Sequence, residues 1–346
     1  MGAVLQISSQ PRVQQIPGDT GCIYVRRETV PVLSVITVTW NGKKYVEECL
    51  QSLDQESRTP TEVIVIDNAS TDGTPELVER TFPRFTAIRN ARNLGFAKAN
   101  NIGIRLSRGK YLCLINSDVV VPPNSLDELY RYMEANPDVA VVGPQMLGPD
   151  FAVRRSTMRL PSVSNSFCRA VAADQWPFLS RLVGGQMMSD FRHNHTADVE
   201  VLNGWFWMLR REAVEQVGLL DERFFMYGED MDWCRRFLDA GWRLVFYHGA
   251  RAVHYGGASS SVAPVRFYLE MQRANLQYWE KHHGLVALLA HRSILIFHHV
   301  IRLAGHSIAF LILARRRAEL SNKIKRSWAL LAWLASGYRH YSRTAD

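Results

Sequence analysis

Acidic residues that follow apolar strands are the side chains of this sequence best placed to carry out chemistry. Asp118 comes just after the apolar run of residues 111–115, and Asp67 ends a second such run. An acid at the carboxyl edge of a sheet lies where α/β proteins bind ligands, and it needs a metal ion or hydrogen-bond donors as partners. Asp67 would accept hydrogen bonds from a nucleobase or ribose. Taken alone, both acids also fit turn or capping residues.

A third group of acids, Glu229, Asp230 and Asp232, lies at the start of a predicted helix. Acids at that end of a helix can simply complement its dipole. Aromatic residues flank this group on both sides, so we expect a partly desolvated site. Desolvation raises the pKa of a carboxyl group and makes it a better general base near neutral pH.

His254 follows an apolar strand and opens a glycine-rich loop. A single histidine is usually a packed or surface residue, but a neutral imidazole in this place can also bind a metal. Asp118 and His254 together would offer one oxygen and one nitrogen to Mg²⁺ or Mn²⁺. Diphosphate and water would fill the remaining coordination positions.

These residues need a sheet that brings strand ends together. Strands alternate with helices over about a hundred residues, which predicts a mainly parallel α/β sheet with right-handed crossovers. Thr74 is the expected N-cap of the second helix, and residues 144–203 are less regular. The predicted strands cover residues 33–39, 61–67, 85–89, 111–115, 139–142, 205–209 and 243–247, and the predicted helices cover residues 45–53, 96–106, 124–136, 211–217 and 230–240.

Composition and charge divide the chain into three parts. We expect a leader over residues 1–30, one α/β domain over residues 31–262, and a helical, basic region over residues 263–346. Residues 281–346 carry a net charge of +9, whereas residues 1–280 carry −1. A basic tail on a neutral domain argues against nucleic-acid binding and favours an anionic surface. Five scattered cysteines without a CxxC motif and the lack of a secretory signal favour the cytoplasm.

The basic tail has the pattern of an interfacial membrane helix over residues 285–314. Four polar residues interrupt every possible apolar run long enough to span a bilayer: Arg292, His298, His299 and Arg302. They gather on one side of the helix, with a polybasic cluster at residues 315–326 after it. Trp328, Trp333 and Tyr338 are expected at headgroup depth. Alternatively, these helices dock on the domain or form a homo-oligomer.

Several motifs together resemble glycosyltransferase family 2, the inverting enzymes with a GT-A fold. They are LSVITVTWNG, VIVIDNASTDGT, RNLGFAKANNIGI, the NSD variant of a DxD motif, YGEDMDWCRR and VHYGG, in the expected order between residues 33 and 254. Residues 143–161 and the basic tail are similar to the bacterial rhamnosyltransferase-like branch, which acts on lipid-linked sugars. The expected fold is thus a GT-A, Rossmann-like α/β sheet followed by C-terminal amphipathic helices.

The resemblance implies a role for each matching residue. Thr39 and Asp67 would contact the base of a nucleotide-sugar, and Asn93, Gly95 and Phe96 would lie beside this donor. Asp118 would bind the metal that carries the diphosphate, His254 would complete its coordination, and Asp230 would be the catalytic base. Asn116 stands on the donor side where the DxD pattern has its first acid, which leaves one carboxylate fewer for ribose or metal.

The acceptor side is less defined. Trp205 and Phe206 would stack on an acceptor sugar or pack in the core, and Glu229 would contact its hydroxyl groups. Arg154 and Arg155 would bind an acceptor diphosphate or lie in a solvated loop.

The implied reaction is inverting transfer of a single sugar to a polyprenyl-diphosphate-linked saccharide at the inner face of the cell membrane. The favoured sugar is L-rhamnose, donated by dTDP-rhamnose. This step belongs to bacterial cell-surface polysaccharide assembly. The alternatives are a UDP- or GDP-sugar donor, a sugar-nucleotide pyrophosphorylase, and a non-catalytic carbohydrate- or membrane-binding module.

Overall fold

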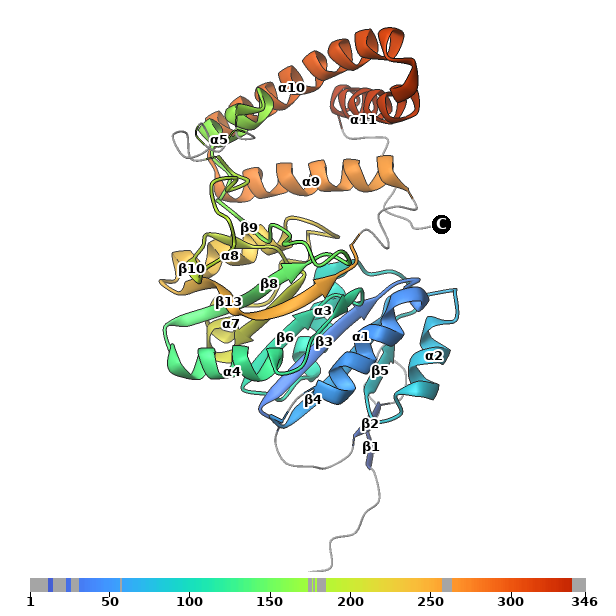
Figure 1. The fold of residues 1–346 in the computed structure, drawn as a ribbon, viewed down its shortest axis with the longest axis vertical. Coiled ribbons are helices and arrows are strands. Elements are labelled where there is room, and N and C mark those ends of the chain that lie inside the picture. Colours follow the sequence, from blue (N-terminus) through green and yellow to red (C-terminus); the bar gives the residue numbers. More distant parts are fainter. Residues whose placement is uncertain are drawn as a thin grey trace, which may run out of the picture.

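A nine-stranded sheet forms the centre of the structure, and a group of helices from the C-terminal part of the chain stacks above it (Figure 1). The computed structural model describes residues 31–56, 58–173, 176, 178, 185–256 and 263–337, as well as two short paired strands. These are β1 (Arg12–Gln14) and β2 (Ile23–Val25), which pair antiparallel within the expected leader.

The strand order of the main sheet is β10-β13-β8-β12-β6-β3-β4-β5, and β7 pairs with β13. Neighbours β3–β4, β3–β6, β4–β5 and β8–β13 are parallel, whereas β12 runs antiparallel between β6 and β8. The bounds are β3 (Leu33–Thr39), β4 (Thr61–Asp67), β5 (Thr86–Arg89), β6 (Tyr111–Ile115), β7 (Val119–Val120), β8 (Val139–Leu147), β10 (Ala197–Asp198), β12 (Phe206–Arg210) and β13 (Arg243–His254). A separate small ladder joins β9 (Thr157–Met158) to β11 (Val201–Leu202).

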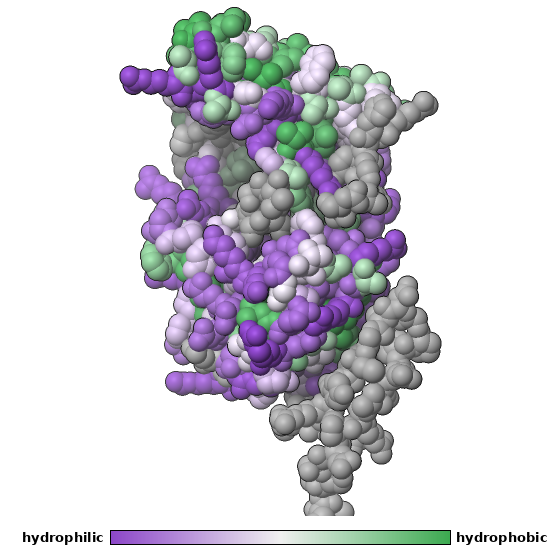
Figure 2. Space-filling model, turned by 90° about the vertical axis from the view of Figure 1, so that its right-hand side faces the viewer, coloured by the Kyte–Doolittle hydropathy of each residue, from purple (hydrophilic) through white to green (hydrophobic). Residues whose placement is uncertain are grey.

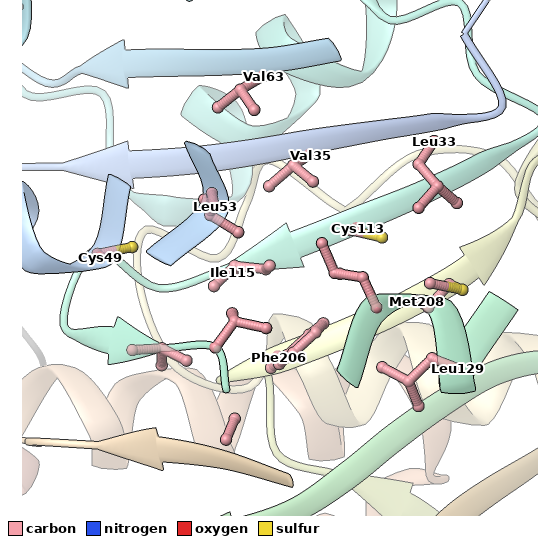
Figure 3. Packing of buried hydrophobic residues seen from close by; sticks show 14 of the residues in the cluster. Leu33, Val35, Cys49, Leu53, Val63, Cys113, Ile115, Leu129, Phe206 and Met208 are labelled. Carbon is pink, nitrogen blue, oxygen red and sulfur yellow. The ribbon is translucent and has the colours of Figure 1, made fainter. Parts of the chain in front are cut away.

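Helices cover both faces of the sheet because alternate strand residues point to opposite sides and both sets are apolar. One core contains α1 (Lys43–Glu56), α2 (Thr74–Thr81) and α4 (Ser125–Ala135), which pack on residues such as Val35, Cys113 and Met208 (Figure 3). The other core contains α3 (Phe96–Leu106), α7 (Arg211–Val217) and α8 (Glu229–Asp239). The expected mainly parallel α/β sheet with helices on both faces is therefore confirmed.

Three local expectations were wrong. Thr74 is the first residue of α2 and Gly73 is the N-cap; the Thr74 hydroxyl donates to Asp72 Oδ1. Strands β8 and β13 are each several residues longer than predicted, and β13 continues through a register shift between Tyr247 and Arg251. His254 is therefore the last residue of a strand. The segment expected to be less regular, residues 144–203, contains the helix α5 (Val163–Ala170), with a capping box at Ser162.

The C-terminal helices are α9 (Pro264–His282), α10 (Leu285–Ile312) and α11 (Arg317–Ala335). Helix α9 lies between the sheet domain and the α10–α11 hairpin (Figure 1), and its Tyr278 and Trp279 are buried together with Phe224 of the domain. This part of the C-terminal region thus docks on the domain. Trp333 is buried between the helices and does not reach a headgroup layer, while Tyr338 lies outside the described residues.

Helix α10 is long and apolar enough to cross a membrane by length and composition. Of its most apolar window, 6% is buried inside the structure. Few residues of this window are fully buried, so one side of the helix remains exposed while the other contacts α5, α9 and α11.

Candidate active site

Asp118 and His254 meet at the carboxyl edge of the sheet. The short strand β7 pairs with the end of β13, and this register places His254 opposite Val119. Asp118 Oδ1 lies 3.3 Å from His254 Nε2, and each side chain is 11% exposed. The Asp118 carbonyl also accepts a hydrogen bond from the amide of Tyr255. Two strands therefore hold this oxygen and nitrogen together in a largely desolvated position.

The pair suits a divalent cation. Two ligands about 2.1 Å from one metal, at right angles to each other, lie about 3 Å apart, close to the observed separation of the two atoms. Within the described residues, no group of three or more histidine, cysteine or acidic side chains comes together to hold a metal. A cation bound by Asp118 and His254 would therefore take its other ligands from substrate phosphate and water, as Mg²⁺ commonly does.

Unsatisfied polar atoms line the edge next to this pair. Thr39 Oγ1, Asp67 Oδ1 and Asn116 Oδ1 are buried without a hydrogen-bond partner in the described structure. The other Asp67 oxygen accepts a bond from the amide of Ser70, while burial raises the pKa of Asp67. Buried polar groups without partners are costly, so a polar ligand that formed hydrogen bonds with these three atoms would be stabilised. These three residues are the ones expected to face the nucleotide.

Asn68 organises the donor side, a role that its sequence motif did not predict. Its side chain is buried, accepts bonds from the Leu94 amide at 2.9 Å and Asn90 Nδ2 at 3.1 Å, and donates to Asn93 Oδ1 at 2.9 Å and the Gly95 carbonyl at 3.2 Å. It thereby fixes the loop before α3 against the end of β4. The sequence signal was its place directly after the strand-ending acid.

The loop before α3 also contacts the segment that precedes α8. The amide of Phe96 donates to the Phe225 carbonyl at 2.6 Å. Gly95 has φ 83°, and a Cβ atom there would collide with the same carbonyl. Glycine is required at Gly95 for both reasons. The predicted donor residues and the acidic helix are therefore joined directly.

Asp230 lies in the first turn of α8 with two backbone donors. Its Oδ1 accepts from the Met231 amide at 2.8 Å and its Oδ2 from the Gly204 amide at 3.4 Å. Burial raises the pKa of Asp230, although these amides limit the effect. Burial and the neighbouring Asp230 charge raise the pKa of Glu229 well above its usual range. Both carboxyl groups therefore keep their protons to higher pH than exposed acids do.

Residues 203–205 connect the two parts of the site. Gly204 donates to Asp230, the Trp205 carbonyl accepts from the Asn116 amide at 3.0 Å, and the Trp205 ring lies 4.7 Å from that of His254. The structure thus brings the expected base, the expected metal pair and the NSD segment to one place.

Two acceptor expectations change. Phe206 is 2% exposed and packs in the core (Figure 3), so it does not present a stacking face, whereas Trp205 is half-buried beside His254. Arg154 and Arg155 are both exposed, and Arg154 pairs with Asp150 at 2.8 Å. The solvated-loop alternative describes the two arginines in this structure.

A sequence model of Glycosyl transferase family 2 matches residues 34–218. A relative from Mycobacterium tuberculosis, described as N-acetylglucosaminyl-diphospho-decaprenol L-rhamnosyltransferase, is 30% identical over 248 residues, covering 67% of this chain and 79% of the relative. The chain therefore belongs to glycosyltransferase family 2 and is a glycosyltransferase. The similarity to its rhamnosyltransferase branch is confirmed.

Two solved structures share the fold. Mannosyltransferase PcManGT from Pyrobaculum calidifontis, in complex with GDP-Man and Mn²⁺, aligns with a TM-score of 0.55 and 19% identity over 91% of this chain and 89% of that one. GalNAc-T7 with UDP, GalNAc and Mn²⁺ aligns with a TM-score of 0.51 and 15% identity over 74% of this chain and 52% of that one. These likenesses support the GT-A fold, and both structures contain Mn²⁺.

Proposed function

We propose that this glycosyltransferase transfers one sugar, L-rhamnose from dTDP-rhamnose, to a polyprenyl-diphosphate-linked saccharide with inversion at the anomeric carbon. The observation that carries this proposal is the joining of Asp230 to the Asp118–His254 pair through residues 203–205. The relative named as a rhamnosyltransferase acting on a decaprenol-linked acceptor supports the choice of sugar and carrier.

In the proposed reaction, Asp230 removes the proton of an acceptor hydroxyl group as its oxygen attacks the anomeric carbon. The new carbon–oxygen bond forms on the face opposite the nucleoside diphosphate, which leaves with the electrons of the broken bond. Positioned general-base catalysis contributes about 10²- to 10⁴-fold to the rate. The raised pKa of Asp230 makes it a stronger base than an exposed carboxylate.

The donor lies along the edge of the sheet where the buried oxygens of Thr39, Asp67 and Asn116 lack hydrogen-bond partners. Thr39 and Asp67 accept hydrogen bonds from the base and ribose, and residues 93–96 lie beside the sugar, held by Asn68. Asp118 and His254 would hold Mg²⁺ or Mn²⁺, which would supply positive charge to the diphosphate of the donor. Asn116 contributes an amide oxygen on the donor side. Glu229 and Trp205 contact the acceptor.

We place the enzyme at the cytoplasmic face of the cell membrane, as a peripheral protein in cell-surface polysaccharide assembly, because its proposed acceptor is a membrane lipid. Single-sugar addition, rather than binding alone, is the role that the acidic site supports. A carbohydrate-binding module has no need of a buried base beside a metal pair.

A donor screen tests this function. Purified protein is incubated with dTDP-rhamnose, UDP-sugars or GDP-sugars, a lipid diphosphate acceptor carrying N-acetylglucosamine, and Mg²⁺ or Mn²⁺, and the product is analysed by mass spectrometry and NMR. We expect rhamnose transfer with inverted configuration, which Asp230→Asn abolishes. Transfer from a UDP- or GDP-sugar instead would move the donor assignment to that alternative. Formation of nucleotide-sugar from sugar phosphate would identify a pyrophosphorylase, and no turnover with any donor would favour a non-catalytic module.

A further inference from the structure

The outer face of α10 is apolar and uncovered. Its exposed large hydrophobic residues recur every three or four positions, so they form one stripe along the helix. They are between 42% and 84% exposed: Leu285, Val286, Leu289, Ile296, Phe297, Val300, Ile301, Ile308, Leu311 and Ile312. Hydrophobic surface gathers at this end of the molecule, whereas the sheet domain is mostly hydrophilic (Figure 2). At about 1.5 Å per residue, the helix is about 40 Å long.

The polar face of α10 is turned inward. His291 stacks on Trp279 of α9 with ring centroids 4.4 Å apart, and His299 is hydrogen-bonded to Tyr268 at 2.9 Å and to Ser327 of α11 at 3.2 Å. Burial lowers the pKa of both histidines to about 4, so they are neutral near pH 7. The helix therefore uses its polar side for packing on the protein and leaves its apolar side free, the reverse of a surface helix in a soluble protein.

Helix α5 extends this surface. It lies against α10, with Ser166 hydrogen-bonded to His291 at 3.3 Å and the Ala170 carbonyl accepting from His298 at 3.1 Å. Val163 and Phe167 of α5, and Val171 directly after it, are exposed apolar residues at four-residue spacing. This spacing places them on one side of the helix. A segment that comes more than a hundred residues earlier in the chain thus adds a second apolar stripe.

Charge decides which partner this surface suits. Neither α5 nor α10 contains an acidic residue. Arg169 of α5 and the three arginines of residues 315–317, which follow closely after α10, are exposed; Arg316 also pairs with Glu319 of α11. A second copy of the same face would bring like charges together, whereas anionic headgroups would pair with the arginines. An exposed apolar surface of this extent also marks an interaction site.

We infer that α5 and α10 together form the membrane-binding surface of this protein, with their apolar stripes among the acyl chains of an anionic lipid layer. This inference rests on the proposed function, because a polyprenyl-linked acceptor has to be reached from the lipid surface. It assigns α5, and not the C-terminal tail alone, to that contact. Through Trp279, the same surface is packed on the helix that abuts the domain.

Vesicle sedimentation of the full chain tests the surface. We compare the wild type with Phe167→Glu/Val171→Glu on α5 and with Ile296→Glu/Val300→Glu on α10, using phosphatidylglycerol and phosphatidylcholine vesicles. Phe151→Glu, which places the same charge on an exposed aromatic residue outside α5 and α10, is the control. Circular dichroism checks folding. A second α5 variant, Phe167→Ser/Val171→Ser, removes apolar contact without adding charge.

Each glutamate pair should lower partitioning into anionic vesicles by at least about tenfold, since two apolar side chains that enter the lipid layer are replaced by charges. The serine pair should lower it by a smaller factor, and Phe151→Glu should bind like the wild type. Unchanged vesicle binding of both α5 variants would overturn the inference. So would a wild-type protein that does not bind anionic vesicles. The inference would also fail if the only effect of the variants were to convert a wild-type dimer into monomers.

Transfer to a short, water-soluble acceptor in detergent is measured in parallel. The variants should retain this activity and lose transfer to a long-chain acceptor in vesicles. Absence of any transfer by the wild type would count against the proposed function alone, because vesicle binding is read independently.

Discussion

Lys281 at the end of α9 and Asp232 in the first turn of α8 form a salt bridge, with Nζ 2.6 Å from Oδ1 of a carboxylate that is 0% exposed. Arg236 and His282 contact the same carboxylate at 2.9 Å and 2.7 Å, and Lys281 also reaches Asp221 at 2.8 Å. A residue from the C-terminal helices thus holds the helix that begins with Glu229 and Asp230. Asp232, one of the three acids at the start of this helix, is therefore a structural anchor.

Asp232→Ala should destabilise the protein by about 3–5 kcal/mol, because it leaves buried cationic groups without their partner. Urea unfolding measures this loss. Asp239→Ala is a matched control on the same helix, since Asp239 forms an exposed pair with Arg235 that contributes less than about 1 kcal/mol. Equal effects of the two substitutions would show that the buried cluster does not anchor α8.

Asp230→Asn should reduce kcat by at least about 10²-fold and leave nucleotide affinity nearly unchanged, because the amide cannot take the acceptor proton. Rapid-quench kinetics and calorimetric titration of the nucleotide give the two values. Since burial raises the pKa of Asp230, the wild-type rate should rise with pH through a pKa above that of an ordinary aspartate. Loss of nucleotide binding in the variant would remove Asp230 from the role of base.

Glu229→Gln should change how stability depends on pH. A carboxyl group with a raised folded pKa binds its proton more tightly in the folded state, so stability falls as pH rises from the unfolded toward the folded pKa. Glutamine removes this decline. The difference in unfolding free energy between variant and wild type should therefore grow from pH 5 to pH 8 in favour of the variant. A constant difference would contradict the raised pKa of Glu229.

Asp118→Ala and His254→Ala should each weaken Mn²⁺ binding in the presence of nucleotide by at least about tenfold. Electron paramagnetic resonance of free Mn²⁺ measures the affinity. His248→Ala is the control, because His248 lies on the same strand without contact to Asp118 in the described structure. If His254→Ala and His248→Ala behaved alike, the imidazole of His254 would not be a ligand.

Asn68→Ala should lower the unfolding free energy by about 2–4 kcal/mol, since four hydrogen bonds of about 1 kcal/mol each are lost. Donor affinity should fall as well, because Asn68 holds the loop at residues 90–95. Asn136→Ala removes a side chain with one bond, to the Tyr132 carbonyl, and should cost about 1 kcal/mol without affecting the donor. Unchanged donor affinity in Asn68→Ala would restrict this residue to a role in stability.

Local patterns were sufficient for several central strands and most helices of the sheet domain. The apolar runs at residues 33–39, 61–67 and 111–115 ended at turn residues, and the structure has the same bounds. The acids at strand ends could be placed at one edge because parallel strands share a direction. The type of fold and the family were therefore readable from order and spacing.

The tertiary structure decided what depends on pairing across the chain. The β7–β13 register brings Asp118 to His254. Contacts between distant parts of the chain give Asn68 its four hydrogen bonds and bury Phe206 in the core. An isolated helical wheel shows that α10 has two faces but not which one meets the protein; packing on α9 and α11 turned its histidines inward. Periodicity is a property of neighbours in sequence, whereas burial and hydrogen bonding depend on residues that folding brings together.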